Sequence, residues 1–164
     1  MSATNLITTL EKLYKLHKSL FDLSVNKTDI IKKGDMSELD RVLKGEQKHL
    51  AAIHTMEAER QRESSHYLQS RGVPFNESST ISQCIEHSSL QEKDTLAHWQ
   101  QKLIGIIREL KDQNELNQKL VYQSLQFVNM NLSMTQPQPE SSTYTRPNGE
   151  KKLPSSQSIF DSKA

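Results

Sequence analysis

The sequence has few of the residues that build cross-linked, nucleotide-binding or aromatic-rich folds. Its 164 residues include one cysteine, five glycines and 5% aromatic residues. A lone Cys84 excludes an intramolecular disulfide, and five scattered glycines leave no glycine-rich loop to hold a phosphate. Residues 1–15 lack the basic start and the unbroken apolar stretch of a secretory signal. We therefore expect a protein of the reducing cytoplasm, and nothing in the sequence supports nucleotide binding.

Strong charge of one sign and long apolar runs are also missing. Twenty-one basic residues offset twenty acidic ones, so no overall field favours nucleic acid or an anionic membrane. The longest apolar runs fall far below the roughly 18 residues that cross a bilayer. With 34% hydrophobic and 25% charged residues, the composition favours long exposed helices over a compact globule. We expect neither nucleic acid binding nor a membrane span.

The first half of the chain predicts two long helices. Apolar residues at three-and-four spacing predict one helix from Thr4 to about Lys33, where Gly34 is suited to close it. This stripe consists of Leu6, Leu10, Leu13, Leu16, Leu20 and Leu23. Residues Asp35 to Glu38 then have the form of a capping box, in which each side chain bonds the other residue's backbone. The second helix should start there.

The second helix should end before Gly72 and the Val73-Pro74 pair. Glycine closes a last turn, and the residue before a proline is pushed out of helical geometry. The apolar stripe of this helix is Leu39, Val42, Leu43, Leu50, Ile53 and Met56. Polar residues 60–65 then interrupt the stripe before Tyr67 and Leu68. We therefore expect the far end of this helix to be thinly buried.

The second half of the chain predicts one short and one long helix. Residues 80–87 have apolar residues at helical spacing and predict a short helix or an ordered turn. Ser89 to Glu92 has the form of a second capping box, and the apolar spacing behind it continues to Met134. This amounts to about 65 Å of helix, more than twice what the short segment can cover. Part of the long helix should lie bare or bind a partner.

After Met134 the composition changes to a stretch rich in proline, serine and glycine, which cannot bury enough apolar surface to offset its ordering entropy. We therefore expect residues 1–135 to form one helical domain and residues 136–164 to form a flexible tail. The predicted fold class is all-α, an antiparallel helical hairpin or bundle of three long helices plus a short helix.

One pattern in the sequence is typical of an enzyme. Glu46 with His49 and Glu63 with His66 have the Glu-x-x-His spacing of di-iron helical bundles. Both pairs fall on one predicted helix, about 25 Å apart, whereas a dinuclear site needs its pairs on facing helices. We interpret them as a solvated polar face. No catalytic residue, metal site or cofactor is predicted.

Two single residues have structural interpretations. Cys84 has no companion cysteine at redox-motif spacing, and its apolar neighbours favour a small core residue over a nucleophile. Gly105 lies within the apolar residues 103–107, where glycine costs about 1 kcal/mol relative to alanine. It either permits a close helix crossing or is a tolerated weakness.

The stretch from residue 116 to residue 134 has two apolar faces. One consists of Leu116, Leu120, Phe127, Met130 and Met134, and the other of Val121, Leu125, Val128 and Leu132. A second apolar face at the end of a helix favours a groove for a partner's amphipathic helix, with methionines adapting to its shape. The alternative is that this end packs on the first helix, and the pattern leaves both open.

Several segments along most of the chain carry a family resemblance. They are Leu6 to Leu23, Ile30 to Asp35 with Leu39, Leu43, Glu46-Gln47 and Arg60, Asn114 to Leu120 leading into Ser124-Leu125, and Tyr144, Gly149 and Ile159 to Asp161. Together they resemble the FlgN-type flagellar export chaperones, which escort the hook-filament junction proteins FlgK and FlgL. The resemblance implies a binding module that is not an enzyme.

The resemblance implies that the C-terminal helix recognises a C-terminal helical segment of FlgK and FlgL, prevents premature assembly and delivers them for export. The residues that we expect to contact this substrate are Leu116, Leu120, Val121, Leu125, Phe127 and Val128. Asp35, Glu38, Asn114 and Asn117 should instead serve the fold. Components of the flagellar export gate or its ATPase are further candidate partners. The alternative function is a coiled-coil adaptor, or a chaperone for filament or cap protein.

Overall fold

The fold consists of helices throughout the residues that the structure describes. The structure is a computed structural model and describes residues 3–74 and 79–136. The helices are α1 Thr4–Lys33, α2 Met36–Ser70, α3 Ile81–Glu86 and α4 Leu90–Thr135. This confirms the all-α prediction of three long helices and a short one. All but the first residue of the predicted tail lies outside the described residues.

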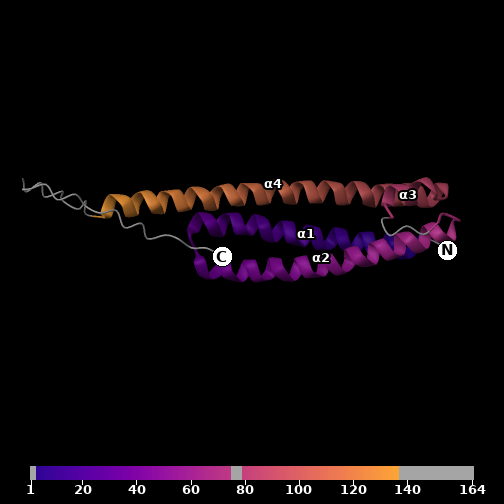
Figure 1. The fold of residues 1–164 in the computed structure, drawn as a ribbon, viewed down its shortest axis with the longest axis horizontal. Helices are drawn as coiled ribbons and strands as arrows, with labels where there is room; N and C mark the ends of the chain where they lie inside the picture. Colours follow the sequence, from indigo (N-terminus) through magenta and orange to yellow (C-terminus); the bar gives the residue numbers. More distant parts are fainter. Residues whose placement is uncertain (1–2, 75–78, 137–164) are drawn as a thin grey trace, which may run out of the picture.

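Helix α1 lies between α2 and α4 in an elongated molecule (Figure 1). Helix α2 returns antiparallel to α1, whereas α4 runs parallel to it, with Ala3 bonded to Glu92 at one end and Thr28 bonded to Asn117 further along. Within the described residues the backbones of α2 and α4 do not approach each other closely, although the Tyr67 hydroxyl of α2 donates a hydrogen bond to Glu92 of α4 at one end. Helix α3 packs against both of them at the end where α1 begins. None of these helices has a stretch long and apolar enough to cross a membrane.

Glycine closes both long helices of the hairpin, as predicted. Gly34 has a φ of 70° and Gly72 has a φ of 82°, a left-handed conformation that side chains with a Cβ disfavour. After α1, the N–H of Asp35 bonds the carbonyl of Ile30, and the N–H of Gly34 bonds that of Ile31. This Schellman pattern satisfies carbonyls that the helix leaves open. The same pattern follows Leu68 at the end of α2.

The predicted capping boxes form only in part. The Asp35 carboxylate accepts a bond from the Glu38 N–H at 3.0 Å, but the Glu38 carboxylate pairs with Arg41 rather than reaching back. At α4 the prediction is wrong, because the Ser89 side chain makes no capping bond to the helix backbone and instead donates to Glu92. The Glu92 carboxylate bonds Ala3, Tyr67 and Arg71 instead of the backbone N–H of Ser89. A complete box, which the sequence analysis missed, forms at α3 between Thr80 and Gln83.

The main core lies where all four helices meet. It consists of Ala3, Leu6, Leu10, Tyr67, Leu68, Cys84 and Leu96. The far end of α2 is therefore well buried, contrary to the prediction of a thinly buried end, because α3 folds back over it. Leu43 and Leu50, two members of the apolar stripe predicted on α2, are exposed.

Two helices approach each other closely at Gly45 and not at Gly105. A Cβ on Gly45 would lie 3.1 Å from Leu23 Cδ2, so this glycine allows α1 and α2 to pack tightly. A Cβ on Gly105 would meet no atom within 4 Å. Gly105 therefore marks no helix crossing.

Candidate functional site

Helix α4 extends well past the α1–α2 hairpin. The Thr28–Asn117 bond joins residues 89 positions apart on parallel helices, so Lys33 at the end of α1 comes level with Tyr122. Residues 123–135, here called the overhang, continue beyond that level, as Figure 1 shows. Every side chain of the overhang is exposed. The bare end that the sequence analysis expected is therefore present.

Two hydrogen-bonded asparagines fix this alignment of α1 and α4. Asn117 is buried, accepts a bond from the Thr28 hydroxyl at 2.6 Å and donates to the Ser24 carbonyl at 2.8 Å. One turn earlier, Asn114 accepts a bond from the Ser24 hydroxyl. Buried amides need such partners, and a shift of one residue would remove them. Both asparagines thus serve the fold.

The six residues expected to contact the substrate lie on α4 but on two sides of it. At about 100° per residue, the Leu116–Leu120–Phe127 side and the Val121–Leu125–Val128 side are roughly 125° apart. Five of the six are exposed, with Phe127 at 61%, and Leu120 is half-buried. The structure therefore brings them together as two surfaces, not as one site.

The first surface is an apolar stripe formed by Leu116, Leu120, Phe127, Met130 and Met134. Its spacing of four, seven, three and four residues fits a heptad repeat, with Gln123 at the remaining position. A heptad repeat of this kind is the seam along which one helix packs against another in a coiled coil. On the free molecule the stripe faces solvent.

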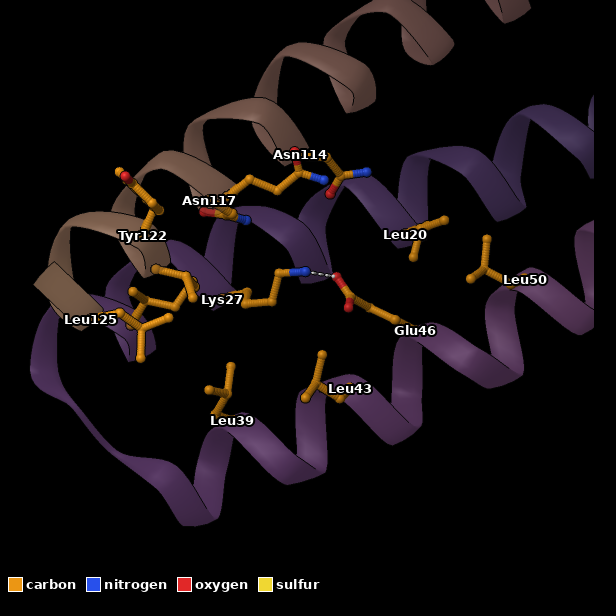
Figure 2. A pocket seen from close by; sticks show the side chains of 13 residues that line it. Leu20, Lys27, Leu39, Leu43, Glu46, Leu50, Asn114, Asn117, Tyr122 and Leu125 are labelled. Carbon is orange, nitrogen blue, oxygen red and sulfur yellow. Dashed lines mark hydrogen bonds and ion pairs between the residues drawn. The ribbon is translucent and has the colours of Figure 1, made fainter. Parts of the chain in front are cut away.

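Val121 and Leu125 of the second surface line an open groove of about 650 Å³ between α2 and α4, with α1 at its base, whereas Val128 lies beyond the lining residues. The groove is lined by Leu20, Lys27 and Ile31 of α1, by Leu39, Leu43, Glu46 and Leu50 of α2, and by Asn114, Asn117, Gln118, Val121, Tyr122 and Leu125 of α4. Figure 2 shows Leu39 and Leu43 of α2 pointing into the groove, with Leu125 of α4 on its other side. Val121 and Leu125 of the α4 wall were expected from the sequence to be contact residues, whereas the α2 wall was not.

A single ion pair crosses the base of the groove. Lys27 Nζ lies 2.6 Å from Glu46 Oε1, and both side chains are shielded, with 14% and 13% of their surfaces exposed. The dashed line in Figure 2 marks this pair. Because each charge neutralises the other, the groove presents an apolar surface without net charge to an occupant.

The first of the two Glu-x-x-His pairs, Glu46 with His49, has structural partners rather than lying on a solvated face. Glu46 pairs with Lys27, and His49 bonds the Gly45 carbonyl and the Ser19 hydroxyl. In residues 3–74 and 79–136 no three histidine, cysteine, aspartate or glutamate side chains gather closely enough to hold a metal ion. Cys84 is fully buried, and burial raises the pKa of its thiol above the usual range. A buried, protonated thiol is a core residue and not a nucleophile.

Comparisons with known proteins identify the family of the chain. The family model described as FlgN protein matches residues 1–152. The curated Bacillus subtilis (strain 168) protein described as uncharacterized protein YvyG is 34% identical over 165 residues, covering 100% of both chains. No solved structure matches the chain significantly. The chain belongs to the FlgN family of flagellar export chaperones.

Proposed function

We propose that this protein is a cytoplasmic export chaperone for the hook-filament junction proteins FlgK and FlgL. The observation that carries the proposal is the overhang of α4, whose apolar residues all face solvent. Family membership supports a role in flagellar export, and the overhang offers the surface that such a role requires. A C-terminal helical segment of FlgK or FlgL would cover the stripe.

In this proposal, a junction-protein helix that would otherwise contact another junction protein contacts the stripe on α4 instead. A helix with a heptad stripe associates through that stripe with any complementary helix. Junction proteins assemble through terminal helices, so a chaperone that occupies such a helix keeps it from assembling early. Release at the export apparatus then frees it. The chaperone contributes binding and no chemical step.

The test compares neighbouring residues of the overhang. Phe127→Glu places a charge on the stripe, whereas Gln126→Glu places the same charge on the adjacent, off-stripe position. We expect Phe127→Glu and the double variant Leu120→Glu, Phe127→Glu to weaken binding of a junction-protein C-terminal peptide about 30-fold or more. Gln126→Glu should bind like the wild type. Calorimetric titration gives the affinities.

Thermal melting of each variant separates binding from folding. Phe127 lies on the overhang, so its replacement should leave the melting temperature unchanged, while half-buried Leu120 reports any cost to the fold. Unchanged affinity of the double variant would remove the stripe from the binding site. Tighter binding of filament-protein or cap-protein peptides would instead assign the chaperone to another flagellar substrate.

A further inference from the structure

The groove between α2 and α4 is distinct from the stripe and is already occupied at one end by a helix of the chain itself. Helix α3 contacts both α2 and α4, and its Cys84 is fully buried among Leu10 of α1, Leu68 of α2 and Leu96 of α4. Ile81 and Ile85 pack at the edge of the same cluster. The chain thus shows what fits between these walls: a helix with apolar residues at positions i, i+3 and i+4.

Beyond α3 the same row of α1 residues continues without a helix above it. Leu6 and Leu10 lie in the core with α3, and the next members of the row, Leu13 and His17, line a hollow of about 320 Å³ that begins at Thr80. Leu20 and Ile31 then line the open groove. The fold is therefore a four-helix arrangement whose fourth position is filled only over the six residues of α3.

We propose that the open groove seats one amphipathic helix of the exported partner, in line with α3, so that the partner completes the four-helix arrangement. The proposal rests on the proposed function, because it takes the exported protein as the source of the helix. The helix should present an uncharged apolar face, since Lys27 and Glu46 neutralise each other at the base. Charged residues on that face would lose hydration without gaining a partner.

The groove side of α4 sets the length of the helix that the groove can bind. The groove-side residues of α4 begin at Asn114, and the same side continues along the overhang through Val128 and Leu132. At 1.5 Å per residue this track is about 27 Å long, which matches a helix of roughly 18 residues. Phe127 lies on the opposite side of α4, so a helix in the groove leaves the stripe free for a second segment.

The experiment uses a matched pair of charge substitutions in the α1–α2 hairpin. Leu43 on the groove wall and Val25 on α1, outside the groove, have similar exposures of 44% and 41%. Binding of full-length FlgK and FlgL to the whole protein is measured for Leu43→Glu, Val25→Glu and Phe127→Glu. We expect Leu43→Glu to weaken binding about tenfold or more and Val25→Glu to change it less than twofold. Leu50→Glu repeats the test on the same wall if Leu43→Glu does not fold.

Hydrogen exchange gives a second measurement on the wild-type protein. Amides of residues 39–50 on α2 should exchange more slowly when the partner is bound, although the stripe lies on α4 and not on α2. If Leu43→Glu and Leu50→Glu bound the partner with wild-type affinity while Phe127→Glu bound it weakly, the groove proposal would be overturned. The proposed function would remain. Absence of FlgK and FlgL binding to the wild type would overturn both.

Discussion

Glu92 joins three separate parts of the molecule through one carboxylate. It accepts a bond from the Ala3 N–H at 2.8 Å, lies 2.6 Å from Arg71 and accepts a bond from the Tyr67 hydroxyl at 3.1 Å. The start of α1, the end of α2 and the start of α4 therefore meet at a single charge. The bond from Ala3, with the nearby hydroxyls and Arg71, lowers the pKa of this carboxyl below its usual value of 4.5.

The first prediction concerns Glu92→Gln. The amide retains an oxygen for Ala3 but loses its charge toward Arg71, so the free energy of unfolding at pH 7 should fall by about 1–3 kcal/mol. Because folding lowers the pKa, the stabilisation is present above about pH 4.5 and is lost as the pH falls through the folded value. Urea unfolding at pH 7 and pH 3 measures both.

The control is Glu115→Gln, which removes an exposed carboxylate from the same helix. It should leave the free energy of unfolding nearly unchanged at either pH. If Glu92→Gln destabilised the protein equally at pH 7 and pH 3, the charge of Glu92 would not be the cause.

At the scale of helices, α4 changes character along its length. Its first part packs on α1 and α3, with Leu96, Ile106 and Leu110 buried, whereas the overhang is exposed on every side. An isolated helix of about a dozen residues is marginally stable in water. The overhang therefore depends on its continuity with the packed part of α4 for its helical structure.

The corresponding prediction is a step in hydrogen exchange along α4. Amides of residues 96–117 should exchange slowly, and those of residues 123–135 should exchange close to the rate of an unprotected helix end, because no tertiary contact opposes local opening. Exchange measured by mass spectrometry on the free protein tests this. Equal protection on both sides of Tyr122 would mean that the overhang is covered in solution.

The sequence predicted the helices well because their signals are local. Gly34, Gly72 and the apolar spacing act within a few residues, and each helix begins and ends close to its predicted position. The capping boxes were less predictable. Ser89 and Glu92 have the required spacing, but Glu92 bonds residues that are distant in sequence, and no local pattern reveals that competition.

The candidate site was predictable only in part, for a related reason. Periodicity showed that the end of α4 has two apolar sides, but it could not show that α2 and α4 remain apart. The apolar side chains Leu43 and Leu50 look like core residues on a helical stripe, and only the missing neighbour leaves them exposed. The helix lengths did contain the signal, since three long helices and one short one cannot complete a four-helix bundle.

At the scale of the whole molecule, the two ends have different tasks. The main core lies where α3 closes the groove, and the exposed groove and overhang lie at the other end. Burial of apolar surface at the closed end stabilises the fold, while the open end leaves apolar surface exposed, where the proposed function needs it. The separation allows residues at the open end to change with little effect on folding.

This separation predicts that the same Leu→Ala truncation lowers the free energy of unfolding by different amounts at the two ends. Leu10 is fully buried at the closed end, so Leu10→Ala should lower the free energy of unfolding by about 2–5 kcal/mol through lost burial and the remaining cavity. Leu43 is 44% exposed on the groove wall, so Leu43→Ala should cost about 1 kcal/mol or less. Urea unfolding followed by circular dichroism compares the two variants directly. Since both remove the same atoms, any difference reflects their surroundings, and an equal cost would place the groove wall inside a closed core.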